Sequence, residues 1–334
     1  MRIAILGAGF CGLAAAWHLK KNDNIEITLF DPLGIGKGAS GVAAGLLHKY
    51  AGSHAKRNWR SEEGYQATLD LLRVAEEELG IPVARNSGML RVAHSKEQEL
   101  DFEECSQNNP DDVHWRSSEE CKEAVPSLVP LPGIFIDTAM IVDCERYLQG
   151  LWLACQRKGV TLEKRGIHSL AELSAYDIIV CAMGAATNSI VELQHIKLKP
   201  VKGQVLSCRW PDDVAPLPYP INSQAYLLMN PDNKSCIVGA TFEREFVTTD
   251  PDLTTALDEI LPKLHAFFPY LDASSVITCR AGTRAATPDH KPLLIKATEN
   301  CWVLSGMGSK GLLYHALFAK ELAELIKNSM KSIN

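Results

Sequence analysis

The chain opens on a short apolar run, residues 2–6, that leads into a glycine-rich turn. Residues 12–20 then place apolar side chains at helical spacing, and residues 25–30 alternate apolar and polar positions up to Asp31. Short apolar runs and alternation are typical of strands, whereas a spacing of three or four residues is typical of helices. The opening of the chain therefore predicts a strand–helix–strand unit.

The same criteria predict further elements along the chain. Helices are predicted over residues 61–79, 143–158, 253–268 and 312–326, and strands over 160–162, 176–182 and 301–305. The first of these helices ends before Gly80 and Pro82, which are common helix terminators. Residues 83–140 predict short strands in an otherwise irregular segment, and residues 200–280 are rich in strand-like patterns.

The hexapeptide Gly-Ala-Gly-Phe-Cys-Gly follows the first predicted strand and has the form G-x-G-x-x-G. In this context Gly7 permits a tight turn, Gly9 lets the backbone approach a pyrophosphate, and Gly12 lets the helix pack close to the strand. The free N–H groups at the start of the helix, at Phe10 and Cys11, then face the phosphates. The motif predicts a Rossmann-type dinucleotide site without distinguishing NAD from FAD.

Two later features extend this site. Asp31 ends the second predicted strand, where a carboxylate can accept hydrogen bonds from ribose hydroxyls and would repel a 2′-phosphate. Residues 38–48 form a second glycine-rich segment whose small side chains let the backbone lie against a large flat ligand, and Ser40 offers a hydroxyl to phosphate. From composition alone, an ordinary flexible loop remains an alternative interpretation of this segment.

The order of the elements favours two interleaved lobes over two consecutive domains. The predicted fold class is α/β (α+β overall), with a Rossmann-type cofactor lobe interleaved with a β-rich substrate lobe. The cofactor lobe is expected over residues 1–80, 143–199 and 280–334, and the substrate lobe over 81–142 and 200–279.

Several segments resemble the D-amino-acid-oxidase superfamily of FAD-dependent oxidoreductases. They occur in the family's order along the whole chain, at residues 38–48, 176–185, 199–205, 226–228, 239–243, 281–292 and 306–312. The resemblance implies FAD as the cofactor, bound non-covalently because no cysteine occupies residues 306–312. The cofactor contacts that the resemblance implies, beyond those of the first motif, are Ser40, Ala44, Gly45, Leu46, Gly184, Gly308, Ser309, Lys310, Gly311 and Leu312.

The resemblance also nominates residues for the substrate. It implies that Arg284 holds a substrate carboxylate, which a planar guanidinium can bind through two parallel hydrogen bonds. Tyr226 and His48 are further candidates, and each has a purely structural role as its alternative. Lys310 is expected near the substrate and the flavin, where positive potential stabilises an anionic reduced flavin. No catalytic base is assigned.

Two branches of the superfamily fit the motifs, and they imply different substrates. The first comprises glycine oxidases, which implies a free amino acid such as glycine, sarcosine or a D-amino acid. The second is the FAD domain of the tRNA-modification enzyme MnmC, which implies a carboxymethylaminomethyl-uridine in tRNA. The loop at 308–312 and the basic residues between Lys49 and Arg60 favour the tRNA substrate. A non-catalytic flavin-binding protein and a nicotinamide dehydrogenase remain the alternatives outside the superfamily's chemistry.

Composition narrows these possibilities only slightly. The chain has 334 residues, of which 46% are hydrophobic and 22% charged, an ordinary globular composition. Its net charge of -6 counts against a general grip on nucleic acid. No apolar run is long enough to predict a membrane span. Ten scattered cysteines without a C-x-x-C pair predict free thiols in the reducing cytoplasm and no metal site, and the oligomeric state is left open.

Overall fold

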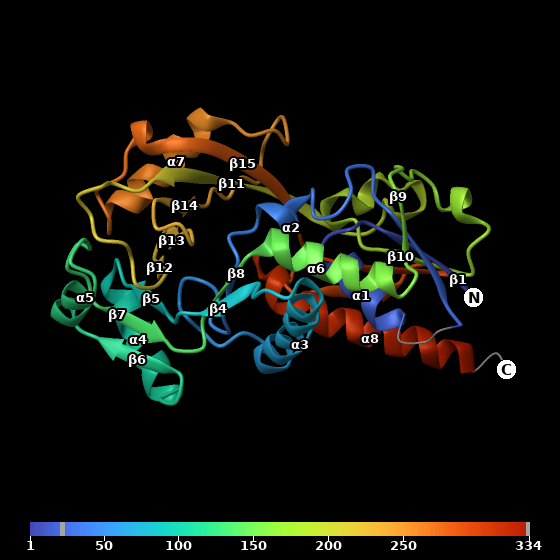
Figure 1. Ribbon diagram of the computed structural model, residues 1–334, viewed down its shortest axis with the longest axis horizontal. Helices are drawn as coiled ribbons and strands as arrows, with labels where there is room; N and C mark the ends of the chain where they lie inside the picture. The colour runs from blue at the N-terminus through green and yellow to red at the C-terminus, as the bar shows by residue number, and fades with distance from the viewer. Residues whose placement is uncertain (21–23, 332–334) are drawn as a thin grey trace.

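The computed structural model describes residues 1–20 and 24–331, which form three sheets (Figure 1). The six-stranded sheet contains, in spatial order, β16 (Leu293–Lys296), β17 (Cys301–Ser305), β10 (Ile178–Cys181), β1 (Arg2–Leu6), β2 (Glu26–Phe30) and β9 (Thr161–Glu163). Its strands pair in parallel except for β16, which is antiparallel to β17. This is the predicted Rossmann-type sheet, built from three separate parts of the chain.

Helices cover one face of this sheet, and shorter segments cover the other. The covering helices are α1 (Phe10–Leu19), α3 (Ser61–Leu79), α6 (Cys144–Arg157) and α8 (Gly311–Lys331). Ile3 and Ile5 pack with the helices, whereas Ala4 and Leu6 pack with the layer on the opposite face. Because β1 is buried on both faces from Ile3 onward, its sequence is apolar from Ile3 to Leu6 rather than alternating.

The eight-stranded sheet occupies the other end of the molecule (Figure 1). Its strands, in spatial order, are β15 (Val276–Ala286), β11 (Lys199–Arg209), β14 (Ser235–Gly239), β13 (Tyr226–Met229), β12 (Ile221–Asn222), β5 (Met89–Val92), β7 (Gly133–Ile136) and β6 (Val113–Arg116). Helix α7 (Leu253–His265) contributes to the core of this lobe. Strand β15 continues to Ala286, so the eight-stranded sheet extends past residue 280, where we expected the cofactor lobe to resume.

A third, small sheet lies between the two larger ones in Figure 1. It consists of β3 (Leu46–Leu47), β8 (Met140–Val142) and β4 (Ala84–Asn86). The chain thus crosses between the lobes repeatedly, in keeping with the interleaving that the sequence predicted. No helix in the described part of the chain is both long and apolar enough to span a membrane.

Residues 83–140 are more ordered than the sequence suggested. The sequence analysis did not predict helices α4 (Lys96–Asn108) and α5 (Ser118–Ala124). Only Gln98, Phe102 and Cys105 of α4 are buried, so the helix has almost no apolar stripe to detect. Helix α5 has a capping box, in which the side chains of Ser117 and Glu120 each accept a hydrogen bond from the other residue's backbone N–H.

Candidate active site

The first glycine motif has the close packing that the fingerprint requires. Gly7 has φ +99°, a left-handed conformation that disfavours any other residue. A Cβ at Gly12 would overlap the carbonyl oxygen of Gly7, and a Cβ at Gly9 would lie 2.7 Å from the hydroxyl oxygen of Ser40. Each glycine therefore keeps a specific space empty, and the backbone at Gly9 lies directly beside the second glycine-rich segment.

The start of α1 is suited to an anion. The backbone N–H of Phe10 donates to the Ser40 hydroxyl at 3.0 Å. The helix has no acidic side chain in its first turn, and Gly9 provides no capping side chain. Partial positive charge at the helix N-terminus is thus available to phosphate groups, with Ser40 alongside.

Asp31 shapes the turn that faces this motif. One carboxylate oxygen accepts the N–H of Ala8 at 2.9 Å, and the other accepts the N–H groups of Leu33 and Gly34 at 2.9 and 3.0 Å. A carboxylate offers about four lone-pair positions, so one remains for a ribose hydroxyl. The residue therefore has a structural role that the sequence did not indicate, in addition to the ribose contact that was predicted.

The second glycine-rich segment joins the cofactor motif to the substrate lobe. It contains the short helix α2 (Ala39–Val42), which packs against β15 where Gly282 leaves room for it. A Cβ at Gly282 would lie 3.0 Å from the Cα of Ala39. Arg284 lies two residues further along the same strand. Consequently, the segment expected to bind FAD phosphates is packed directly against the strand expected to bind substrate.

A cavity of about 170 Å³ lies between the loops of the two lobes and contains Arg284 in its wall. The cavity is lined by the loop after β3, by strands β11 and β15 with the segment after β14, by the loop after β15, and by the loop before α8. The lining residues are Ala51, Gly52, Asn58, Val201, Phe242, Arg284, Ala286, His290, Gly306, Met307, Gly308, Ser309 and Lys310.

Arg284 is a largely buried cation whose charge is not neutralised by a carboxylate among the described residues. Its guanidinium donates to the carbonyl oxygen of Thr241 at 3.1 Å and lies 5.6 Å from the centre of the Phe242 ring. Burial lowers the pKa of Arg284, with a small opposing effect from Tyr226 and none from any acid. A Cβ at Gly203 would overlap this guanidinium, so the glycine of β11 makes the position of Arg284 possible.

The loop before α8 forms another part of the cavity wall, next to the end of β15, where Ala286 and Met307 form a β-bridge. Gly308, Ser309 and Lys310 make one turn of 3₁₀-helix, in which Gly308 has φ +56°. Burial lowers the pKa of Lys310, whose ammonium lies 5.8 Å from the ring centre of Tyr314. The predicted contacts at 311 and 312 lie in the first turn of α8, beside Phe10 of the glycine motif.

Tyr226 and His48 lie outside the lining of this cavity. The Tyr226 ring covers Gly239, and its hydroxyl has no hydrogen-bond partner among the described residues. Burial raises its pKa, although Arg284 acts in the opposite sense, so the phenol stays protonated. His48 is buried, and its Nδ1 accepts the N–H of Tyr50 at 3.3 Å. Burial and then Arg91 lower the pKa of His48 to about 3, which keeps it neutral.

The remaining predicted cofactor residues occupy tight positions. Gly45 has φ +85°, and a Cβ there would overlap the carbonyl oxygen of Val142; Leu46 follows it in β3, and Ala44 precedes it. Gly184 has φ +56° and its carbonyl oxygen accepts the hydroxyl of Ser305 at 3.2 Å. Cys11 is partly buried, and burial raises the pKa of its thiol to about 12, which leaves it unreactive.

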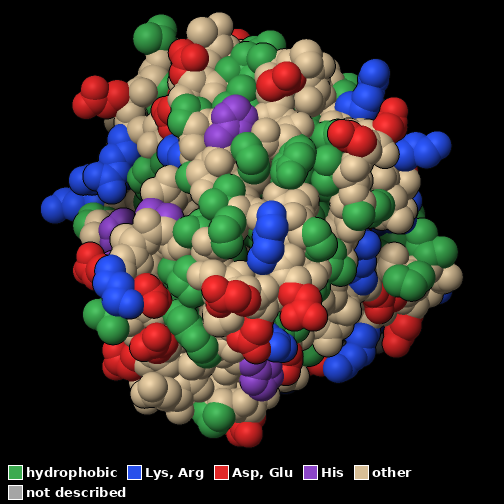
Figure 2. Space-filling view, turned by 90° about the vertical axis from the view of Figure 1, so that its left-hand side faces the viewer, with side chains coloured by type: hydrophobic (Ala, Val, Ile, Leu, Met, Phe, Trp, Pro, Cys, Tyr) green, Lys and Arg blue, Asp and Glu red, His purple; other side chains and the backbone are tan. Residues whose placement is uncertain are grey.

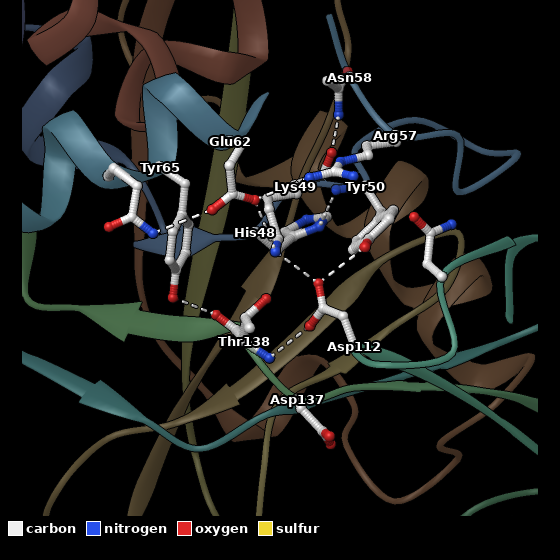
Figure 3. Close-up of polar contacts among 12 residues, drawn as sticks. His48, Lys49, Tyr50, Arg57, Asn58, Glu62, Tyr65, Asp112, Asp137 and Thr138 are labelled. Atoms are coloured by element: carbon white, nitrogen blue, oxygen red, sulfur yellow. Dashed lines mark hydrogen bonds and ion pairs between the residues drawn. The ribbon is translucent and has the colours of Figure 1, made fainter. Parts of the chain in front are cut away.

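Four of the five basic residues from Lys49 to Arg60 are paired with carboxylates, and Figure 3 shows the surroundings of Lys49 and Arg57. The buried Lys49 ammonium lies 2.9 Å from Asp112 and 3.2 Å from Glu62. Arg57 also binds Glu62 at 2.9 Å, and Arg60 binds Glu63 and Glu321. His54 contacts Asp101. The exposed Lys56 is the one member of this group without an ion pair among the described residues. The group therefore leaves one uncompensated side chain in place of the basic rim that the sequence suggested for a tRNA substrate.

Several cavity residues were not identified from sequence. Ala51, Gly52 and Asn58 belong to a loop with no motif; Gly52 is held by Arg91 of β5, and Asn58 is held by the carbonyl of Lys49. Phe242 and His290 lie within segments that carry the family resemblance, which was the available signal, although neither was singled out.

A second cavity of about 500 Å³ adjoins the loop after Asp31 and is lined in part by Lys37, Lys164 and Arg280.

Known proteins share both the sequence pattern and the fold. The sequence profile of the DAO family, described as FAD dependent oxidoreductase, matches residues 2–325. Glycine oxidase of Bacillus subtilis is 25% identical over 99% of this chain and 93% of its own length. The crystal structure of glycine oxidase from Geobacillus kaustophilus superimposes with a TM-score of 0.84 over 98% of this chain and 95% of that one, at 22% identity.

A bifunctional relative matches over part of its length. The protein MnmC of Idiomarina loihiensis, named for tRNA 5-methylaminomethyl-2-thiouridine biosynthesis, is 23% identical over 96% of this chain, which spans 55% of that relative. The open start of α1, the Ser40 hydroxyl and the glycines that a Cβ would fill all fit the dinucleotide that the family profile names. The chain belongs to the DAO family of FAD-dependent oxidoreductases.

Proposed function

We propose that this enzyme oxidises the C–N bond of an amine that carries a carboxylate. The observation that supports this most strongly is Arg284, a largely buried guanidinium on the cavity wall, whose one hydrogen-bond acceptor among the described residues is a main-chain carbonyl. Burying an unpaired cation is costly, and a carboxylate ligand would remove that cost. The same guanidinium is planar, so it suits a carboxylate better than an ammonium would.

Each of the proposed site residues has a distinct role in this reaction. Arg284 binds the carboxylate and thereby orients the adjacent carbon of the substrate. Tyr226 stays protonated near Arg284 but lies behind the residues that line the cavity, and Lys310 supplies positive charge from the loop before α8. FAD, when bound, would accept a hydride from that carbon of the neutral amine, and the iminium ion left behind would take up water to give a carbonyl compound and the protonated amine. Positioning and exclusion of water account for catalysis without an assigned protein base.

A small free amino acid is the first substrate candidate, because the cavity of about 170 Å³ has room for little more than the reacting end of a substrate. An amine carried on tRNA is the second candidate, and one observation favours it. Trp59 and Phe242 are about half exposed beside the cavity, and Lys291 and Arg244 lie 5.4 and 5.5 Å from their respective ring centres. Aromatic faces beside cations are typical of surfaces that stack nucleobases.

The distribution of charged side chains favours neither of these two substrates. Figure 2 shows acidic and basic side chains interspersed over the end of the molecule that carries the eight-stranded sheet, with hydrophobic side chains between them. Such a face has no single-sign field of the kind that steers a polyanion.

Anaerobic mixing of the FAD-loaded protein with a panel of amines tests the proposal. The panel contains glycine, sarcosine, D-alanine and tRNA bearing carboxymethylaminomethyl-uridine, and bleaching of the flavin absorbance is recorded. Bleaching by one of these decides the substrate class. A protein that binds FAD but is bleached by none of them, while its flavin remains reducible by dithionite, would contradict the proposed function.

A further inference from the structure

Arg91 is a further buried cation close to the cavity, and the proposed mechanism does not use it. It lies on β5 with 4% of its surface exposed, and no carboxylate pairs with it among the described residues. Its Nη1 donates to the carbonyl of Tyr50 and its Nη2 to the carbonyl of Gly52, each at 2.6 Å. Burial lowers its pKa to about 10. Apart from the Phe102 ring, whose centre lies 5.2 Å from the guanidinium carbon, the two backbone carbonyls are the groups that this buried charge contacts.

These two carbonyls flank Ala51, which lines the cavity together with Gly52. The peptide between Tyr50 and Ala51 is trans, so its C=O and N–H point in opposite directions. Because the Tyr50 carbonyl points at Arg91, the Ala51 N–H points away from Arg91. Among the described residues, no acceptor takes a hydrogen bond from this N–H.

The loop is held against the substrate lobe at further points, so its orientation is fixed. Gln98 donates to the carbonyl of Ser53 at 2.9 Å, and the Tyr50 hydroxyl donates to Asp112 at 2.9 Å. Figure 3 shows Tyr50, Lys49 and Thr138 converging on Asp112. With these contacts in place, rotation of the Tyr50–Ala51 peptide would require breaking the short bond to Arg91.

We infer that Arg91 is a positioning residue that presents the Ala51 N–H to the cavity as a hydrogen-bond donor for the carboxylate of the ligand. The inference rests on the proposed function for the identity of that ligand. Arg284 then binds the carboxylate from the substrate strand, and Ala51 binds it from the loop. Arg91 itself touches neither substrate nor cofactor and acts through the peptide that it orients.

The test uses the FAD-loaded protein and acetate, a carboxylate without an amine, whose binding is followed by the change in flavin absorbance. Arg91→Met removes the donors, Arg91→Lys retains the charge but reaches one carbonyl, and Ala51→Pro removes the N–H while leaving Arg91 intact. Arg91→Met and Ala51→Pro are each expected to weaken acetate binding about tenfold, the usual cost of losing a hydrogen bond to a charged group. The acetate affinity of Arg91→Lys is expected to lie between that of these two variants and that of the wild type.

Arg85→Met is the matched control, because Arg85 also donates to a main-chain carbonyl, that of Met229 at 2.9 Å, but contributes nothing to the cavity wall. It should bind acetate as the wild type does. Amide hydrogen exchange across residues 49–55 measures how firmly the loop is held, independently of carboxylate affinity. The exchange should accelerate in Arg91→Met and remain unchanged in Arg85→Met.

The outcomes separate this inference from the function on which it rests. Wild-type acetate affinity in Ala51→Pro, which tests the donor even if Arg91→Met does not fold, would overturn the inference. So would wild-type exchange rates in a folded Arg91→Met protein. A wild-type enzyme that is bleached by an amine but does not bind acetate would overturn this inference alone. Acetate binding that weakens as expected, in a protein that no amine bleaches, would overturn the proposed function alone.

Discussion

Two groups of basic residues lie beside the same cavity, and the structure treats them in opposite ways. In the group from Lys49 to Arg60, every basic residue except Lys56 is paired with a carboxylate, and Lys49 lies between Asp112 and Glu62. Arg284 and Lys310 lie on the cavity wall without any carboxylate partner among the described residues. Charge that is neutralised within the protein supports the fold, whereas charge left uncompensated at a cavity is available to a ligand. Counting basic residues in the sequence cannot make this distinction.

The sharpest test of the paired group is removal of Asp112. We expect Asp112→Ala to lower the free energy of unfolding by about 3–5 kcal/mol, because it leaves the Lys49 ammonium buried without its nearer partner. Denaturant unfolding followed by circular dichroism measures the loss. The double variant Lys49→Met with Asp112→Leu should recover most of it, since both charges are then removed. A cost below about 1 kcal/mol for the single change would show that the pair behaves as a surface ion pair.

The corresponding test of the uncompensated group is removal of Arg284. Arg284→Met should raise the KM for a carboxylate-bearing amine by roughly tenfold to a hundredfold, because a charge-assisted contact contributes about 1.5–3 kcal/mol. FAD content and thermal stability should change little, since no carboxylate of the protein loses a partner. Steady-state kinetics and thermal unfolding together check both statements. Arg284→Lys should be intermediate, and an unchanged KM in Arg284→Met would remove the residue from substrate binding.

His48 provides a pH-dependent test of the paired region. Burial, with a further contribution from Arg91, lowers its pKa from 6.5 to about 3, so the folded protein resists protonation that the unfolded chain accepts. The contribution of His48 to the free energy of unfolding is therefore fully present above about pH 6.5. It falls as the pH drops toward 3, by at most about 1.4 kcal/mol per pH unit. His48→Asn should reduce the fall measured between pH 6.5 and 5.

The same variant at pH 8 serves as the reference, because neither state of His48 is then protonated. If His48→Asn and the wild type lose stability in parallel below pH 6.5, the buried imidazole does not govern this part of the pH dependence. The neighbouring acid acts in a lower range. Burial tends to raise the pKa of Asp112, but hydrogen bonds from Lys49, Thr138 and Tyr50 outweigh it and lower the pKa, so its contribution is lost only below about pH 4.

The sequence predicted the parts of the fold and site that depend on local pattern. Strand β1, helix α1 and the glycine motif follow from periodicity and from close backbone approach, and the segment containing Arg284 was found by its resemblance. Helix α4 was missed because it has almost no apolar face. The cavity wall at Ala51 and Gly52 was missed because Arg91, about 40 residues later in the chain, fixes it. Long-range contacts of this kind leave no periodic signal.

The mildest test concerns Arg57, which belongs to the paired group but is about half exposed. Arg57→Ala should change the free energy of unfolding by less than about 1 kcal/mol, because solvent screens an exposed ion pair. It should also leave the KM for a free amino acid unchanged, since Glu62 already neutralises this guanidinium. Unfolding curves and steady-state kinetics with glycine measure both effects. A selective loss of activity toward tRNA, with glycine oxidation intact, would break the comparison: Arg57 would then contact nucleic acid despite its carboxylate partner, and pairing within the protein would not mark a residue as structural.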